Sequence, residues 1–300
     1  MLIITVGILI LAGGLSSRFQ HSDKWVDKIL YPINGKPILN HIIDTLHKAF
    51  GDIVIVTKRE RGDKYREVIG QRNITIVFDD IDNVYHPLIG VQAGIKSLNT
   101  DYVVVIAGDL PYLKLEVVEM LIKYLDDYDL VSPIWSNGVI ETLLVVYRRK
   151  HLESIVDKAL KKEFSKPSDL IRSAYKLKFI PIDKFKSIDP NLRSFISINK
   201  LSDLELSKPS FIVAKDVVRE YELIHEAQHP YWAGLNSYLS GKFGEAAKYF
   251  IKEADLYRDL GWTHLELHAL YDVVNCLNKL KEDISVIEER IEELHEIIGW

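Results

Sequence analysis

Six short runs of consecutive apolar residues, many of them β-branched, recur through the first two thirds of the chain. They are Thr5–Leu11, Ile53–Thr57, Ile74–Phe78, Tyr102–Ala107, Leu130–Pro133 and Leu143–Tyr147. A strand that is apolar at every residue, and not only at every second one, is typical of a sheet covered on both faces. Three intervening stretches have the apolar spacing of amphipathic helices: Ile38–Ala49, Leu88–Leu98 and Leu115–Tyr124. This alternation predicts an α/β domain with a doubly wound, mostly parallel sheet.

The pattern of apolar and polar residues changes after about Leu206. No strand-like run follows, and apolar residues recur three and four apart up to Trp300. We therefore predict two domains, an α/β domain at residues 1–206 and a second, smaller all-α domain at residues 211–300, joined near Lys208–Pro209. The first domain is expected to fold and bind its ligand without the second.

One segment of the helical part, Ser240–Phe250, resembles the middle of a tetratricopeptide repeat. Its small Ala246 allows two helices to approach, and Phe243 and Phe250 can fill the interface between them. Domains of this kind usually bind proteins. We therefore expect a protein partner, or self-association with a second copy of the chain, at the helical domain.

Charge and cysteine content exclude several functions. A net charge of −5 provides no general attraction to nucleic acid, so any phosphate binding must be local. The single cysteine, Cys276, rules out an intramolecular disulfide and a cysteine-based metal site, and it fits a reducing compartment. The apolar start, Met1–Leu11, lacks the basic region and cleavage site of a signal peptide and is too short to span a bilayer. We expect a cytoplasmic protein without a membrane or nucleic-acid partner.

A glycine pair follows the first predicted strand, in the string Leu11-Ala12-Gly13-Gly14-Leu15-Ser16-Ser17-Arg18-Phe19. Glycines let the backbone approach a ligand closely and adopt conformations closed to other residues. Successive amides of such a loop form an anion-binding concavity, and the guanidinium of Arg18 adds donors that suit phosphate. The loop also lies at the carboxyl end of a strand, where doubly wound sheets bind their ligands. Further on, Asp27-Lys28 precedes Asn34-Gly35-Lys36-Pro37-Ile38-Leu39.

The whole string, L-A-G-G-x-S-x-R-F followed by D-K and N-G-K-P-I-L, resembles the N-terminal signature of molybdenum cofactor guanylyltransferases. The resemblance covers about residues 1–206 and implies a Rossmann-like nucleotidyltransferase fold. It implies that the nucleotide is bound by Leu11, Ala12, Gly13, Gly14, Arg18 and Lys28, and that Arg18, Lys28 and Asp109 are catalytic.

The chain departs from the family's signature just after this loop. Gln20 stands where the family usually has a glycine, and the stretch from Arg18 to Asp27-Lys28 is longer. Lys24 is therefore an alternative to Lys28, although the spacing of Lys28 to Gly35 matches the family.

Two carboxylates follow the third predicted strand. Asp79 and Asp80 precede Pro87-Leu88-Ile89-Gly90, which resembles the P-L-x-G at the start of the family's next helix. In the family a carboxylate at this place reads the guanine base, whose N1–H and amino group can both donate to it. The resemblance favours Asp80 for this role, with Asp79 in reserve; the alternative is that both only solvate a strand end.

Two later segments also match the family in order. Gly108-Asp109-Leu110-Pro111 resembles the family's D-x-P, whose aspartate binds Mg²⁺, a cation that prefers carboxylate and phosphate oxygens. An aspartate before a proline can instead form a turn.

The other segment is Phe195-Ile196-Ser197-Ile198-Asn199 with Asp203-Leu204, which resembles the family's N-I-N-T-P-E-D-L. The resemblance makes Asn199 a possible contact to the metal or the acceptor phosphate, and Ser197 replaces the first asparagine. Gly138 with Glu141-Thr142-Leu143 resembles the acceptor-side strand.

Taken over from the family, the reaction is transfer of GMP from GTP to the phosphate of molybdopterin, or of its molybdenum form, with release of pyrophosphate and with Mg²⁺ as cofactor. Three alternatives stay open. The chain could use CTP, could act on a cobinamide, sugar or terpenoid phosphate, or could be an inactive adaptor that works through its helical domain.

Two histidine pairs have helical spacing, His225 with His229 and His264 with His268. No cysteine cluster or H-E-x-x-H string accompanies them, so we expect them on solvated helix faces rather than in a zinc site.

Overall fold

The computed structural model describes residues 4–20, 25–79, 86–206, 208–209, 220–225 and 229–299. Within these residues, eight strands form one sheet in the order β10-β9-β7-β8-β6-β1-β4-β5. The strands are β1 (Val6–Leu11), β4 (Ile53–Thr57), β5 (Thr75–Phe78), β6 (Tyr102–Ala107), β7 (Leu130–Ile134), β8 (Leu144–Arg148), β9 (Lys176–Pro181) and β10 (Tyr221–Ile224). All six apolar runs are strands of this sheet, so the predicted α/β class with a mostly parallel, doubly wound sheet is confirmed.

Strand β1 lies at the centre of the parallel part of the sheet. It pairs in parallel with β4 on one side and with β6 on the other, and β5 continues in parallel beyond β4. Strand β8 runs antiparallel to both β6 and β7. The carboxyl ends of β1, β5 and β6 therefore meet at one edge, and the start of β8 lies at that same edge. This edge carries the candidate site.

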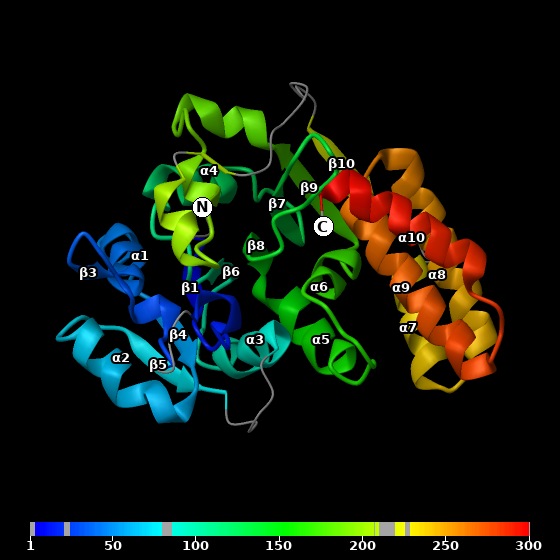
Figure 1. The fold of residues 1–300 in the computed structure, drawn as a ribbon, viewed down its shortest axis with the longest axis horizontal. Helices are drawn as coiled ribbons and strands as arrows, with labels where there is room; N and C mark the ends of the chain where they lie inside the picture. Colours follow the sequence, from blue (N-terminus) through cyan, green and yellow to red (C-terminus); the bar gives the residue numbers. More distant parts are fainter. Residues whose placement is uncertain are drawn as a thin grey trace.

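Helices cover both faces of the sheet. Helices α1 (Ile38–Leu46) and α4 (Leu115–Lys123) lie on one face, while α3 (Pro87–Ile95), α5 (Arg149–Ala159) and α6 (Ser168–Arg172) lie on the other (Figure 1). Helix α2 (Gly62–Ile69) packs beside the edge strand β5, and a small hairpin of β2 (Pro32–Ile33) and β3 (Lys36–Pro37) precedes α1. The three helices predicted from apolar spacing are α1, α3 and α4, each within a few residues of its expected bounds.

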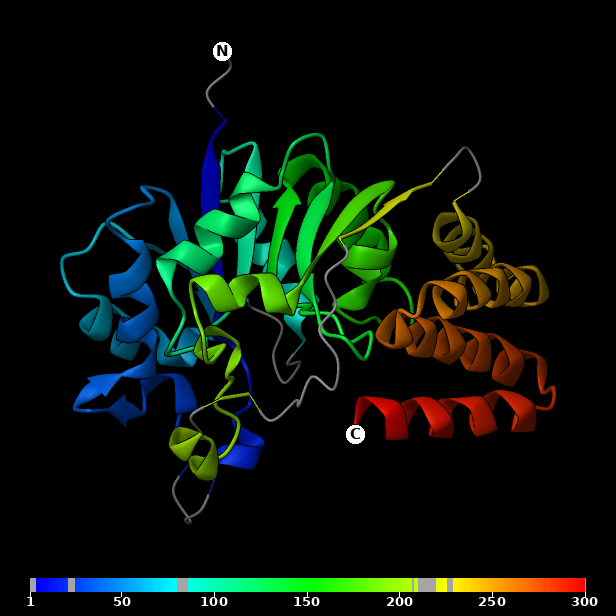
Figure 2. The same ribbon diagram turned by 90° about the horizontal axis from the view of Figure 1, so that it is seen from above.

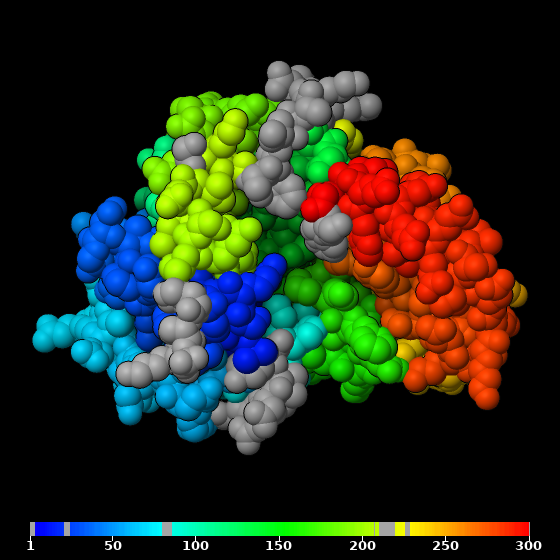
Figure 3. All heavy atoms as spheres, viewed as in Figure 1, coloured from blue at the N-terminus to red at the C-terminus, as the bar shows by residue number. Residues whose placement is uncertain are grey.

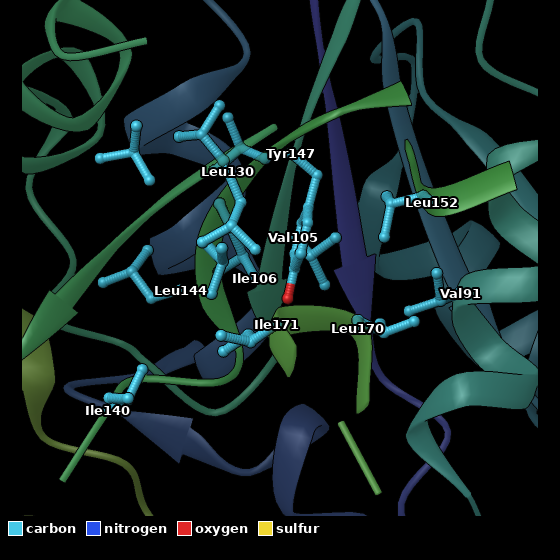
Figure 4. Packing of buried hydrophobic residues seen from close by; sticks show 14 of the residues in the cluster. Val91, Val105, Ile106, Leu130, Ile140, Leu144, Tyr147, Leu152, Leu170 and Ile171 are labelled. Carbon is cyan, nitrogen blue, oxygen red and sulfur yellow. The ribbon is translucent and has the colours of Figure 1, made fainter. Parts of the chain in front are cut away.

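The core between β6, β8 and the helices α3, α5 and α6 is built from aliphatic side chains and Tyr147. Val105 of β6 and Tyr147 of β8 point toward Leu152 of α5 and Leu170 of α6 (Figure 4). These side chains are fully or almost fully buried. Burial on both faces of the central strands explains why their sequences are continuously apolar.

The sequence did not predict β9 or β10. Along β9, Lys176 and Lys178 alternate with Leu177 and Phe179, so the apolar period is two and no continuous run arises. Strand β10 pairs antiparallel with β9 at the sheet edge, with Tyr221 opposite Phe179. It falls within residues 211–300, where only helices were expected, because four alternating residues are too few to stand out.

Four helices complete the chain: α7 (Pro230–Leu239), α8 (Phe243–Leu260), α9 (Thr263–Leu280) and α10 (Ser285–Ile298). Each packs against the one before it, and together they form a stack beside the β9–β10 edge (Figure 2). A β-carbon at Gly234 of α7 would lie 2.6 Å from the ring of Phe250 in α8, so glycine permits this close approach. None of the helices in the described ranges is both long and apolar enough to cross a membrane.

A buried cluster of charges joins the stack to the sheet domain. Arg172 of α6 donates to Glu253 of α8 at 2.6 Å and to Asp272 of α9 at 2.7 Å. Lys162 lies 2.7 Å from both Asp272 and Asp169, and all five side chains are buried. Charges buried in this way must be paired, so removing one partner is expected to cost several kcal/mol.

The histidine pairs are not on solvated faces, and that expectation is wrong. His229, His264 and His268 are buried, because α9 and the start of α7 pack against both the sheet domain and other helices. The ring of His229 donates to the carbonyl of Ala174 at 2.8 Å, and the ring of His264 accepts from the amide of Ile140 at 3.4 Å. Burial lowers the pKa of His264 to about 4.

Candidate active site

The glycine loop begins where β1 ends at Leu11. The sequence placed unusual backbone at the glycine pair, but the positive φ of this loop, 56°, belongs to Ser16. The lack of a side chain at Gly13 instead leaves space for the carboxylate of Asp79. A β-carbon on Gly13 would lie 3.1 Å from the carboxylate of Asp79, and one on Gly14 would point into open space. Both glycines line a cavity, so a ligand bound there can reach the amides of this loop.

Arg61 and Tyr65, which no sequence motif indicates, support the glycine loop by hydrogen bonds to its backbone carbonyls. Arg61 donates to the carbonyl of Gly14 at 2.9 Å and lies 3.7 Å from Asp27. The hydroxyl of Tyr65 lies 3.0 Å from the carbonyl of Ala12 and 3.1 Å from Asp27. Burial raises the pKa of the Asp27 carboxyl, and Arg61 opposes this effect. The only sequence signal for this support is the Asp27-Lys28 pair, whose aspartate fixes the loop while its lysine faces the cavity.

Gln20 is held by hydrogen bonds to backbone groups on both sides of it in the chain. Its side-chain amide donates to the carbonyls of Ser16 and Val26, both at 2.8 Å, and its oxygen accepts from the amide of Val26 at 2.8 Å. The two ends of the longer loop are thereby tied together. Lys24, the alternative to Lys28, lies outside the described residues.

Lys28 forms the centre of the predicted catalytic set. Its ammonium lies 2.6 Å from Oδ2 of Asp109 and 3.1 Å from Oδ1 of Asn199. Arg18 also donates to Oδ1 of Asn199, at 3.5 Å. Four residues that are up to 181 positions apart in the chain thus converge on one point, between the ends of β1 and β6.

The segment before β10 orients Asn199. The amide of Asn199 donates to Oγ of Ser197 at 2.9 Å, so the serine that replaces the family's asparagine still has a structural role. Asp203 accepts from the backbone amide of Asn199 at 2.7 Å, and the amide of Ile198 donates to the carbonyl of Asp109 at 2.9 Å. These bonds keep the amide oxygen of Asn199 beside Lys28.

Asp109 has the chemistry of a ligand for a hard cation. Its Oδ1 is buried, and no group of the described residues forms a hydrogen bond with it. A β-carbon on the preceding Gly108 would lie 2.9 Å from the carbonyl of Leu11, so the turn that presents Asp109 requires glycine. The oxygens of Asp109 and Asn199 fit Mg²⁺, which binds carboxylates and keeps phosphate oxygens and water as its other ligands.

Asp79 lies at the end of β5, beside the glycine loop. It is buried and forms an ion pair with Lys58, which follows β4 and is also buried. Its neighbour Asp80, the first choice for reading the base, lies outside the described residues. Lys58 was not recognised from the sequence, because a lysine after a strand is ordinarily solvated.

Two adjoining cavities surround these residues. One, of about 270 Å³, is lined by the loop from Leu11 to Leu15 and by Lys28, Asp79, Gly90 and Asp109, among others. The other, of about 210 Å³, is lined by the loop from Gly14 to Arg18 and by Lys28 and Asn199. Lys28 borders both, so one elongated ligand can cross from the first cavity to the second beside its ammonium.

The sequence profile of the MobA-like NTP transferase domain matches residues 8–176. The chain belongs to this family. Its members are nucleotidyltransferases, and this chain is a nucleotidyltransferase. The match ends at Lys176, the first residue of β9, so nearly all of β9, β10 and the helical stack lie beyond it.

The chain is also similar to individual relatives and to a solved structure. A probable molybdenum cofactor guanylyltransferase of Pyrococcus horikoshii is 32% identical over 202 residues, 66% of this chain and 96% of that protein. A protein of the same description from Methanosarcina acetivorans is 28% identical, covering 66% of this chain and 87% of the relative. The crystal structure of molybdopterin-guanine dinucleotide biosynthesis protein A from Archaeoglobus fulgidus superposes with a TM-score of 0.55 at 20% identity, over 67% of this chain and 96% of that one. That superposition supports the fold.

Proposed function

We propose that this family member is a molybdenum cofactor guanylyltransferase, which transfers GMP from GTP to the phosphate of molybdopterin. A phosphate oxygen of the acceptor attacks the α-phosphorus of GTP, the bond from that phosphorus to the β-phosphate oxygen breaks, and pyrophosphate leaves. The observation that carries the proposal is the convergence of Lys28, Asp109, Asn199 and Arg18 beside a glycine loop, in a chain whose relatives are described as guanylyltransferases.

In this proposal the two cavities hold different parts of GTP. The base and ribose occupy the cavity lined by Gly13, Asp79 and Gly90, and the phosphates run past Lys28 toward Arg18. Asp79 has the carboxylate chemistry to accept from the N1–H and amino group of guanine, and it is buried in an ion pair with Lys58. Asp80 stays an alternative for this role.

The chain's own cations provide most of the proposed stabilisation. Lys28 and Arg18 neutralise charge on the α-phosphate and on the departing pyrophosphate, and the amides of Gly13 and Gly14 donate to phosphate oxygens. Asp109, with Asn199, would hold Mg²⁺, which neutralises phosphate charge when it is bound. No general base is required, since a phosphate nucleophile is already ionised near neutral pH.

The direct test is incubation of the full-length protein with GTP, Mg²⁺ and molybdopterin, with mass detection of the dinucleotide product and a parallel assay of pyrophosphate. We expect product with GTP and little with CTP, ATP or UTP. Product with CTP instead would make the protein a cytidylyltransferase. Absence of pyrophosphate with every nucleotide would favour the inactive adaptor.

We further propose that the helical stack of α7 to α10 is a tetratricopeptide-like module that binds a protein or a second copy of the chain. The motivating features are the Gly234–Phe250 contact between α7 and α8 and the position of the stack beside the β9–β10 edge of the sheet. The division into residues 1–206 and 211–300 remains a prediction. Size-exclusion chromatography with light scattering tests self-association: a monomer at high protein concentration would exclude it.

A further inference from the structure

The proposed reaction leaves one side of the catalytic centre for the acceptor. The base and ribose are assigned to the cavity near β4 and β5, and Lys28 with Asp109 lies between β1 and β6. The acceptor must then approach from the side of β8 and β7. On this side the space-filling view shows a hollow, bordered by the blue and yellow-green atoms of the sheet domain and by the red atoms of α10, with green atoms at its floor (Figure 3).

Sheet register brings Glu141 to this side, next to Asp109. Strands β6 and β8 are antiparallel, with Ile106 opposite Leu144, and the amide of Ala107 still donates to the carbonyl of Leu143 at 2.8 Å. Asp109 follows Ala107 by two residues and Glu141 precedes Leu143 by two, so both residues lie just beyond the same end of this pair of strands. Consistently, burial and then the negative charge of Asp109 raise the pKa of Glu141 to about 7.

The carboxylate of Glu141 is held at one oxygen and open at the other. The indole N–H of Trp135 donates to Oε1 at 2.6 Å, and Trp135 packs edge-on against Phe195, four residues before Asn199. Among the described residues no donor reaches Oε2, and the side chain of Glu141 is only partly buried. The carboxylate is therefore fixed in orientation and free to accept hydrogen bonds from a ligand.

The helical stack holds the hairpin that carries this carboxylate. The amide of His264, at the start of α9, donates to the carbonyl of Gly138 at 3.2 Å, and the amide of Ile140 donates to the ring of His264 at 3.4 Å. Gly138 has a φ of 78°, and a β-carbon there would lie 2.3 Å from the carbonyl of Gly261. The turn from β7 to β8 is thus seated on the junction between α8 and α9.

We propose that Glu141 binds the acceptor by accepting hydrogen bonds from two adjacent N–H groups of its heterocycle. This inference rests on the proposed function: the pterin ring of molybdopterin carries a ring N–H next to an exocyclic amino group, and a carboxylate pairs with both. A second metal carboxylate is the competing role. The structure favours the acceptor, because the indole N–H of Trp135 already occupies one oxygen of the carboxylate and fixes its orientation.

The test compares full-length wild type with Glu141→Gln, and with Glu222→Gln, an exposed carboxylate of β10, as the matched control. Glutamine keeps the shape but presents an N–H₂ group to the acceptor's donors. We expect the KM for molybdopterin to rise at least about tenfold in Glu141→Gln, with a smaller change in kcat and an unchanged Kd for GTP with Mg²⁺. Binding of the fluorescent probe 6-hydroxymethylpterin, measured without turnover, should weaken by a similar factor.

Each outcome decides the assignment. An unchanged KM and unchanged pterin affinity in Glu141→Gln would overturn it, as would a wild type that does not bind the pterin. A variant that instead requires much more Mg²⁺ would make Glu141 a metal ligand. Should the wild type bind the pterin but form no product from GTP and molybdopterin, the proposed function fails while the pterin measurement still decides the role of Glu141.

Discussion

The ammonium of Lys28 lies 2.6 Å from a carboxylate oxygen of Asp109, so the proposed phosphate-binding cation and the proposed metal-binding anion neutralise each other. Both side chains are largely buried, which strengthens their attraction relative to an exposed pair. A triphosphate entering the site offers Lys28 a second set of anionic partners and leaves Asp109 available to a cation. Nucleotide and Mg²⁺ are therefore expected to increase each other's affinity by the same factor.

Asp109→Asn should abolish most of this coupling. A neutral amide of the same shape is a poor ligand for Mg²⁺, so we expect turnover to fall by roughly 100-fold or more at limiting Mg²⁺. Calorimetric titration of GTP with and without Mg²⁺ measures the coupling directly. Wild-type turnover in the variant would show that the metal is held elsewhere.

Lys28→Ala should lower kcat by on the order of 10²–10³-fold, since a preorganised charge at the reacting phosphate is removed. Lys36→Ala is the control, because Lys36 is half-exposed and pairs with Asp44 away from the cavities. Lys24→Ala extends the comparison to the other lysine of the loop. A larger loss with Lys24→Ala than with Lys28→Ala would reverse the assignment.

Asp79→Ala should relax the choice of base more than it slows the reaction. The carboxylate lies beside Gly13, in the part of the cavity assigned to the base, so it contributes to discrimination before it contributes to chemistry. The ratio of kcat/KM for GTP to that for ATP and CTP measures this effect. Lys58→Met tests the partner of Asp79, and an unchanged ratio in both variants would move base reading to Asp80 or to backbone groups.

Arg172→Met should destabilise the protein by about 3–5 kcal/mol, because Glu253 and Asp272 would lose their buried partner. Urea unfolding measures the loss, and Arg66→Met, which removes an exposed ion pair, should cost less than about 1 kcal/mol.

By the same reasoning a chain ending at residue 208 should be unstable, since Arg172 and Lys162 would lose most of their carboxylates. The sequence alone predicts the opposite, namely that residues 1–206 fold and bind their ligand without the helices. A stable fragment that binds GTP would show that the stack is dispensable.

Acid should weaken the junction with the helical stack. Burial lowers the pKa of His225 to about 4, of His229 to about 3 and of His264 to about 4, whereas each titrates near 6.5 when unfolded. Below pH 6.5 the unfolded state binds more protons, so stability falls as the pH drops toward 4, by up to about 1.4 kcal/mol per pH unit for each histidine. Urea unfolding at pH 7.5, 6.5, 5.5 and 4.5 measures this slope. His264→Gln should reduce the slope, and a stability that rises from pH 6.5 to 5.5 would contradict this account.

The amino-acid sequence alone determined the α/β class, six of the strands and the residues of the glycine loop. These features are local: a continuous apolar run reports burial on both faces, and a glycine pair after a strand reports a close backbone approach. Lys28, Asp109 and Asn199 were also found from the sequence, but only because they match a family's motifs. Nothing in their spacing reveals that they meet.

Only the tertiary structure brought these three residues together, with Asn199 171 positions from Lys28. It also decided the roles of Arg61, Tyr65 and Lys58, whose partners come from other elements. The same holds for the buried histidines, which sequence spacing would place on solvated helix faces, and for the buried ion pairs of Arg172. The reason is physical: burial and charge pairing depend on what packs against a side chain, and the packing elements are distant in sequence.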